Sequence, residues 1–83
     1  MSANMTFDDL KAVMSRCTGD VDDLTPDKLD AAFTDIGYDS LAVLEIASQI
    51  QREYSLQIPD EAIEGMQSPQ AVIDYVNASL AAV

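Results

Sequence analysis

Ser40 is the residue whose position in this chain most favours chemistry. It follows the loop residues Gly37, Tyr38 and Asp39 and precedes a long segment with apolar residues at helical spacing. Its hydroxyl is therefore expected at the beginning of a helix, where the first backbone N–H groups lack intrahelical acceptors and the helix dipole favours negative charge. A phosphate bonded to such a serine is electrostatically favoured. The position predicts a serine that carries a group.

The rest of the chain is poor in catalytic residue types. It contains no histidine and one cysteine, Cys17, so a Ser-His-Asp triad cannot be built and the usual general base is missing. A Ser-Lys pair would need Lys11 or Lys28, both distant from Ser40 in the sequence. The same counts exclude a zinc framework and an internal disulfide. We expect a protein that is not an enzyme, with Cys17 as a small buried apolar residue.

A cluster of aspartates at residues 20–23 invites comparison with a calcium-binding loop. An EF-hand would need glycine at the sixth position and glutamate at the twelfth, where this chain has Thr25 and Ala31. The specific motif is excluded and no metal site is predicted. Loose binding of a divalent cation by these carboxylates remains open beside the simpler interpretation of a solvated acidic loop.

Length and charge bound the class of protein and its partners. The 83 residues suffice for a single domain, 1–83. No apolar stretch is long enough to span a bilayer and no secretion signal is recognisable, so a cytoplasmic protein is expected. The net charge of −11, from 15 acidic and 4 basic residues, repels nucleic acid and anionic membranes and attracts basic protein surfaces. Solubility alone would also explain the charge.

Apolar periodicity and capping residues predict an all-α fold. The first helix is expected after the cap Thr6 and before Gly19, and the last after the cap Ser68, with Pro69 at its first position. Between them lie a helix over 40–54, capped by Asp39 or Ser40, and a short one over 59–64 that buries Ile63. The connection 20–37 is expected to contain one short helical turn from Pro26 to Phe33. The predicted fold is a small bundle of three main helices and one short helix.

The helix over 40–54 has a second apolar feature besides its core stripe. Val43, Ile46, Ala47 and Ile50 are expected to face the core, whereas Leu41 and Leu44 lie beside that stripe, next to Glu45. Exposed leucines rimmed by carboxylates are typical of a surface that docks a partner. A slightly wider core face would explain Leu41 equally well.

The residues 37–41, Gly-Tyr-Asp-Ser-Leu, and the run Ile58-Pro59-Asp60 before the short helix resemble the acyl carrier protein family. The resemblance extends over nearly the whole chain and includes its acidity and its order of helices. It implies that Ser40 is esterified by 4′-phosphopantetheine, transferred from coenzyme A by a phosphopantetheinyl transferase, and that the thiol of this arm carries acyl groups as thioesters. Asp39 resembles the family's aspartate that helps the transferase and its metal ion engage the serine.

Within the family the chain is most similar to discrete carriers of bacterial aromatic (type II) polyketide synthases, because Tyr38 and Ala42 stand where fatty-acid carriers more often have Ala and Asp. This resemblance implies that the protein delivers growing polyketide intermediates to ketosynthase, acyltransferase, ketoreductase and cyclase enzymes with basic docking surfaces. The docking residues it implies are Leu41, Leu44, Glu45, Glu61 and Glu64. A carrier for fatty-acid synthesis is the alternative within the family.

Two further expectations accompany the resemblance. If the helices separate slightly, Leu44, Ala47, Ile63 and Val76 are expected to line a shallow groove for part of the acyl chain. A small, highly charged bundle with no obvious extra interface is expected to be a monomer. The alternative from another class is an acidic helical interaction module in which Ser40 is only a helix cap, since serines before helices are usually caps.

Overall fold

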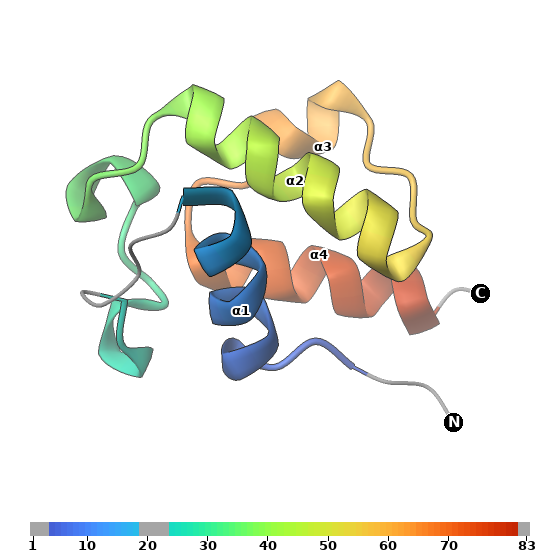
Figure 1. Ribbon diagram of the computed structural model, residues 1–83, viewed down its shortest axis with the longest axis horizontal. Coiled ribbons are helices and arrows are strands. Elements are labelled where there is room, and N and C mark those ends of the chain that lie inside the picture. Colours follow the sequence, from blue (N-terminus) through green and yellow to red (C-terminus); the bar gives the residue numbers. More distant parts are fainter. Residues whose placement is uncertain (1–3, 19–23, 82–83) are drawn as a thin grey trace.

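The computed structural model describes residues 4–18 and 24–81, which form four α-helices and two 3₁₀ turns and no strand within these ranges. The α-helices are α1 (Phe7–Thr18), α2 (Ser40–Tyr54), α3 (Asp60–Gly65) and α4 (Pro69–Ala81). The 3₁₀ turns are η1 (Pro26–Lys28) and η2 (Phe33–Ile36). In Figure 1, α1 lies in front of α2 and α4, and the two turns lie at the end of the bundle where α2 begins. The predicted class of a small bundle with one short helix is confirmed.

Side-chain caps explain where the long helices begin. The Asp9 N–H donates to Thr6 Oγ1 at 3.2 Å, and the Thr6 N–H donates back to Asp9 Oδ2 at 3.0 Å. This reciprocal pair satisfies two backbone donors at the start of α1. At the start of α4, Ser68 Oγ accepts from the Ala71 N–H at 3.2 Å. The predicted caps Thr6 and Ser68 are confirmed.

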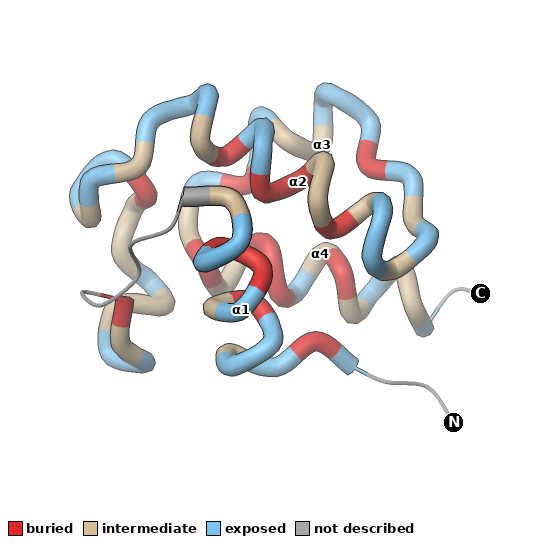
Figure 2. Tube along the Cα trace, in the orientation of Figure 1, coloured by how far each residue is buried: buried red, intermediate tan, exposed pale blue. Residues whose placement is uncertain are grey.

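The core is formed mainly by the predicted helix stripes (Figure 2). Burial of these side chains supplies most of the free energy that holds the helices together, because the apolar surface leaves water. Four buried residues lie outside the helices, where the periodicity gave no prediction: Met5, Leu24, Ile58 and Met66. Within residues 4–18 and 24–81, the hydrophobic core consists of Met5, Leu10, Val13, Met14, Leu24, Phe33, Val43, Ile46, Ala47, Ile50, Ile58, Met66, Val72, Ile73 and Val76.

Some expectations about packing were wrong. The connection before α2 contains two 3₁₀ turns, η1 and η2, in place of one turn from Pro26 to Phe33. Ile63 is only half-buried, because α3 is short and contributes no fully buried residue. Cys17 is also half-buried, since it lies at the end of α1 where the packing against α2 ends.

The acidic run 20–23 and Gly19 lie outside the described residues. Within the described part of the chain, no three His, Cys, Asp or Glu side chains are grouped so that they could hold a metal ion. Among the same residues, no helix has the length and apolar character needed to cross a membrane.

The segment before α1 is tied to α4 by a two-point contact between Met5 and Asn77. The Met5 N–H donates to Asn77 Oδ1 at 2.6 Å, and Asn77 Nδ2 donates to the Met5 carbonyl at 3.1 Å. The Met5 side chain is buried beside this contact, with 2% of its surface exposed. The contact closes the bundle on the side of α4.

Candidate functional site

Backbone turns between η2 and α2 position Ser40. Gly37 ends η2 with φ of 90°, a left-handed conformation that favours glycine, although a Cβ there would meet no atom within 4 Å. The Tyr38 N–H then donates to the Phe33 carbonyl at 2.8 Å. Asp39 is extended, and its Oδ1 accepts from the Ala42 N–H at 2.9 Å. Asp39 is therefore the cap of α2.

Ser40 is the first residue of α2, and its side chain is exposed. Because Asp39 accepts the capping hydrogen bond, the Ser40 hydroxyl is not used as the cap of this helix. The sequence had left Asp39 and Ser40 open as the cap, and the structure decides for Asp39. The hydroxyl is thus available to solvent at the helix N-terminus.

The surroundings of Ser40 fit a phosphodiester on its oxygen. The N–H groups of Ser40 and Leu41 belong to the first turn of α2, where no intrahelical acceptor exists, and the positive end of the helix dipole lies there. The Asp39 carboxylate repels a phosphate, but both groups are at the surface, where water and salt screen that repulsion. Such a group would be held covalently by Ser40 and stabilised by the helix end, with its remaining length in solvent or along the adjoining cavity.

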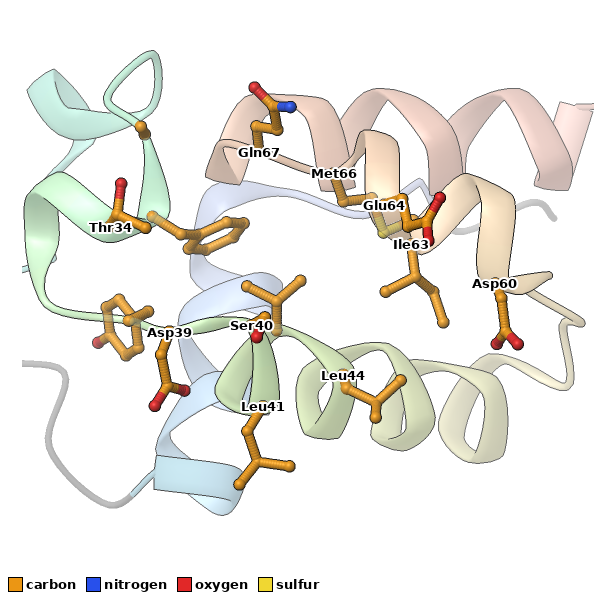
Figure 3. A pocket seen from close by; sticks show the side chains of 14 residues that line it. Thr34, Asp39, Ser40, Leu41, Leu44, Asp60, Ile63, Glu64, Met66 and Gln67 are labelled. Atoms are coloured by element: carbon orange, nitrogen blue, oxygen red, sulfur yellow. The ribbon is translucent and has the colours of Figure 1, made fainter.

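An open cavity of about 760 Å³ adjoins Ser40 (Figure 3). Its walls come from η2, the first turns of α2, α3 and the start of the segment that leads to α4. In Figure 3, Thr34 lies to one side of Ser40, Leu44 and Ile63 lie to the other, and Gln67 lies across from Ser40. Its lining residues are Ala32, Phe33, Thr34, Tyr38, Asp39, Ser40, Leu41, Val43, Leu44, Asp60, Ile63, Glu64, Met66 and Gln67.

The four residues expected to line an acyl groove divide into two pairs. Leu44 and Ile63 line the cavity. Ala47 and Val76 are not among its lining residues, since both are buried in the core behind the wall, with 1% and 0% of their surface exposed. Val43 and Met66 line the cavity in place of Ala47 and Val76.

Leu41 and Leu44 are the large hydrophobic residues that lie exposed within the described ranges, with 62% and 44% of their surface open to solvent. Leu41 therefore does not belong to a widened core face. The carboxylates of Glu45, Glu61 and Glu64 are exposed on α2 and α3. The residues expected to dock partners are thus all exposed on these two helices.

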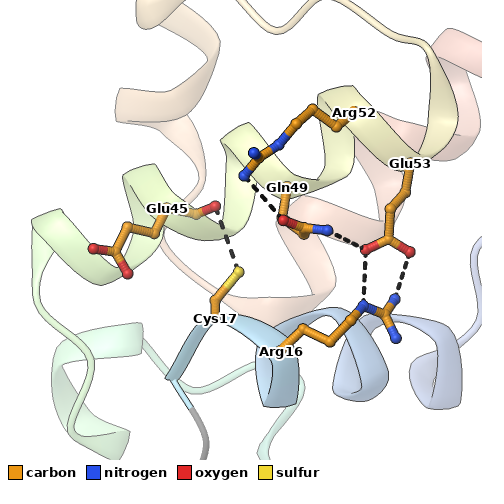
Figure 4. Close-up of polar contacts among 6 residues, drawn as sticks. All are labelled: Arg16, Cys17, Glu45, Gln49, Arg52 and Glu53. Carbon is orange, nitrogen blue, oxygen red and sulfur yellow. Dashed lines mark hydrogen bonds and ion pairs between the residues drawn. The ribbon is translucent and has the colours of Figure 1, made fainter.

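A different arrangement occupies the other half of α2, where α1 packs against it (Figure 4). Arg16 donates from Nε and Nη2 to the Glu53 carboxylate, and Gln49 Nε2 donates to Glu53 Oε2 at 2.8 Å. Arg52 Nη2 donates to Gln49 Oε1 at 3.0 Å. The hydrogen bond from Gln49, followed by that from Arg16, lowers the pKa of Glu53. These polar groups join α1 to α2.

Cys17 lies beside this network, and its Sγ donates to the Glu45 carbonyl at 3.6 Å. Burial, followed by the negative charge of Glu45, raises the pKa of the Cys17 thiol. A raised pKa leaves less thiolate at neutral pH, and the thiolate is the nucleophilic form. The environment of Cys17 therefore favours a structural role and gives it no activation as a nucleophile.

Several cavity residues were missed by the sequence analysis. Phe33 was named only as the end of a predicted helical turn, and Tyr38 served only to compare subfamilies, yet both line the cavity. Asp60 and Gln67 line it as well. The position of Tyr38, two residues before the serine, was a signal that could have placed it there. Gln67 carried no such signal, because its position depends on how α3 ends.

The fold and the site together define a small helical domain that presents a modifiable serine at the first residue of a helix. The chain matches the model of the phosphopantetheine attachment site family over residues 8–76, and it belongs to that family. It is an acyl carrier protein whose prosthetic group is 4′-phosphopantetheine.

The relatives agree with this assignment. The actinorhodin polyketide synthase acyl carrier protein of Streptomyces coelicolor is 40% identical over 83 residues, covering 98% of this chain and 96% of the relative. The oxytetracycline polyketide synthase acyl carrier protein of Streptomyces rimosus is 41% identical over 78 residues, covering 92% and 82%. The solution structure of the 3-oxo-butyl form of the actinorhodin carrier has a TM-score of 0.87 at 38% identity, covering 100% and 99% of the two chains.

Proposed function

We propose that Ser40 carries the 4′-phosphopantetheine group and that the protein delivers polyketide intermediates, held as thioesters on this arm, to the enzymes of a synthase. The observation that carries the proposal is the exposed Ser40 hydroxyl at the first position of α2, where Asp39 performs the capping instead. When bound, the group supplies a thiol on a flexible arm, which raises the local concentration of cargo at each partner.

Asp39 has a second part in this proposal. Its carboxylate is exposed immediately before Ser40, where it attracts a metal ion or a cationic side chain of the transferase that modifies the serine. The same carboxylate fixes the first turn of α2 through Ala42. We assign to Asp39 both the positioning of Ser40 and the recognition by the transferase.

The partners in this proposal are the phosphopantetheinyl transferase and the ketosynthase, acyltransferase, ketoreductase and cyclase enzymes of the synthase. Leu41 and Leu44 provide apolar contact area on α2, and Glu45, Glu61 and Glu64 provide charge around it. Exposed charges of this kind act mainly on the association rate and on orientation. Basic surfaces on the partners would thus bind quickly and release quickly, as successive delivery requires.

The carrier itself is proposed to be non-catalytic, cytoplasmic and monomeric. Within the described residues, the one cysteine lies in an environment that raises its pKa, and the chain has no histidine. The charge of −11 opposes the association of two copies. Sedimentation of the modified protein tests the oligomeric state, and a concentration-dependent dimer would contradict this part of the proposal.

The decisive experiment is intact mass measured before and after incubation with coenzyme A, magnesium and a promiscuous phosphopantetheinyl transferase. We expect a gain of one phosphopantetheine group, absent in Ser40→Ala. Because Ser40 is not the cap, Ser40→Ala should change the free energy of unfolding by less than about 0.5 kcal/mol, so a folded but unmodified variant is the matched control. Peptide mapping assigns the modified residue.

The fatty-acid alternative is tested on the modified protein. A polyketide carrier is expected to accept malonyl groups and support condensation by the ketosynthase of an aromatic polyketide synthase faster than by one of fatty-acid synthesis. The reverse preference would assign the carrier to fatty-acid synthesis. Failure of modification, in a sample shown to be folded and initially unmodified, would return the chain to the interpretation as an acidic interaction module.

A further inference from the structure

The cavity beside Ser40 has two chemically different ends. One end contains Phe33 and Tyr38, whose rings are in contact, and Gln67, whose carbonyl accepts from the Phe33 N–H. The other contains the aliphatic side chains of Leu44 and Ile63, contributed by α2 and α3, with the carboxylates of Asp60 and Glu64 beside Ile63 (Figure 3). Any cargo on Ser40 is placed between an aromatic end and an aliphatic end rimmed by carboxylates.

The aromatic end is built rigidly. The Phe33 and Tyr38 rings meet edge to face, with centroids 6.0 Å apart and an angle of 86° between their planes. The Tyr38 N–H is bonded to the Phe33 carbonyl at 2.8 Å, and the Phe33 N–H to the Gln67 carbonyl at 2.8 Å. Phe33 itself is buried, with 2% of its surface exposed. The backbone of Tyr38 and its ring are thus both fixed against the core.

We propose that Tyr38 is a specificity-determining residue, which retains acyl chains with keto groups at alternate carbons at this aromatic end of the cavity. The inference rests on the proposed function, because it requires cargo on Ser40. The selected cargo is an acyl chain with keto groups at alternate carbons, and the selecting residue is Tyr38.

The physical argument compares a β-keto chain with a saturated chain of equal length. Methylene groups between two carbonyls carry polarised C–H bonds, which are attracted to the negative face of an aromatic ring. Keto oxygens must keep hydrogen-bond donors when they leave water; at this end Thr34 and Gln67 are exposed, with side chains that point away from Ser40 (Figure 3), so water supplies those donors. The aliphatic end offers no such donor from Leu44 or Ile63. A saturated chain has no polar group to satisfy, so it is expected at the other end, where Leu44 and Ile63 offer aliphatic contact area.

The experiment loads Ser40 with a 3-oxohexanoyl or a hexanoyl phosphopantetheine group from the corresponding coenzyme A derivatives, and intact mass establishes loading. Nuclear Overhauser contacts then locate each cargo, and the rate of thioester cleavage by hydroxylamine measures how far it is withdrawn from solvent. We expect the 3-oxohexanoyl group to contact the Tyr38 ring and the hexanoyl group to contact Leu44 and Ile63.

Three variants sharpen the test. Tyr38→Ala should raise the rate at which hydroxylamine cleaves the 3-oxohexanoyl thioester by about fivefold. The cleavage rate of the hexanoyl thioester should stay unchanged. Tyr38→Phe keeps the ring and should retain the contacts. The matched control at the other end, Ile63→Ala, should release hexanoyl cargo and leave the 3-oxohexanoyl contacts in place.

The outcomes separate this inference from the proposed function. Absence of loading at Ser40 would contradict the carrier function itself. Normal loading, followed by contacts of both cargoes with Leu44 and Ile63 and none with Tyr38, would overturn the assignment of Tyr38 while the carrier function stands. The comparison of the two cargoes on the unaltered chain decides the question even if Tyr38→Ala fails to fold.

Discussion

The first turn of α2 meets solvent, a 3₁₀ turn and the short α3, whereas its last turns meet α1 along a continuous interface. At the first end the exposed residues are Ser40, Leu41 and Leu44, and an open cavity adjoins them. At the second end Ile50 is fully buried, and Arg16 and Glu53 join the two helices. One helix is therefore anchored along its length by Val43, Ile46, Ala47 and Ile50, and it presents Ser40, Leu41 and Leu44 to solvent near its N-terminal end.

The difference shows how a small domain holds a reactive position without covering it. Beyond its first turn, α2 is stabilised by the burial of Val43, Ile46, Ala47 and Ile50, in proportion to the apolar area removed from water. The first turn is stabilised by backbone geometry, through the left-handed Gly37, the Tyr38 N–H bond to Phe33 and the Asp39 cap. Caps and turns need little covering structure, so Ser40 is fixed in place and remains open to large partner enzymes.

The largest expected effect comes from truncating a buried side chain near the α1 contact of α2. Ile50→Ala removes a side chain with 0% of its surface exposed, and it should lower the free energy of unfolding by about 2–5 kcal/mol. Leu41→Ala, the matched variant at the exposed end, should change it by less than about 0.5 kcal/mol. Urea unfolding of both variants measures the contrast, and equal losses would show that the exposed end is packed as tightly as the other.

Gly37→Ala should have the next largest effect, because it strains the turn that aims Ser40. A residue with a Cβ pays about 1–2 kcal/mol at the left-handed φ of Gly37, although the space around it is open. Urea unfolding gives the loss. Gly65→Ala is the control, since Gly65 has no positive φ and also has open space around it. A similar small effect at both glycines would mean that the turn relaxes without strain.

Removing the cap of α2 is expected to have a smaller effect. Asp39→Ala loses the hydrogen bond from the Ala42 N–H and should destabilise the protein by about 1 kcal/mol. Asp39→Asn keeps a capping oxygen and should change stability by a few tenths of a kcal/mol, roughly the difference between good caps. If the rate of modification by the transferase falls equally in both variants, the transferase requires the charge of Asp39. If the rate falls only in the alanine variant, the transferase requires the capped first turn of α2.

The smallest effect belongs to the exposed ion pair at the other end of α2. Since hydrogen bonds from Gln49 and Arg16 lower the pKa of Glu53 in the folded state, its contribution is present above the unfolded pKa, near pH 4.3. It is lost as the pH falls through the lower folded pKa. The contribution should stay below about 1 kcal/mol, because both partners are partly exposed.

Glu53→Gln tests this pair. At pH 7 the variant should lack the contribution that this ion pair makes to the free energy of unfolding. Between about pH 5 and 3 its free energy of unfolding should depend less on pH than that of the unaltered chain. Raising the salt concentration should reduce the difference between the two proteins. An unchanged pH dependence would indicate that the ion pair contributes nothing measurable.

The helices and the serine were predictable because local signals specify them. The bounds of α2 agree with the expected 40–54, since a capping aspartate precedes it and the apolar spacing persists to Tyr54. The cap of α4 at Ser68 followed from Pro69 in the same way. These features depend on residues within one or two turns of each other, so the sequence alone contains them.

The walls of the cavity were not predictable to the same extent. Ala47 and Val43 lie four residues apart on one stripe, and periodicity alone does not say which of them borders a gap between helices. The gap exists because α3 has six residues and ends before it covers Val43. Met66 and Leu24 lie in loops and are buried. The paths of these loops depend on long-range packing, which the local sequence does not specify.

The contact between Met5 and Asn77 joins residues 72 positions apart. Closing a flexible loop of that length carries an entropic penalty of about 4 kcal/mol, so the contact can form only after the intervening helices have assembled. It should be absent from the folding transition state. Loss of the Asn77 side chain would then accelerate unfolding and leave the folding rate nearly unchanged, which stopped-flow measurements on Asn77→Ala would resolve. The last bond to form thereby governs how long the native carrier persists.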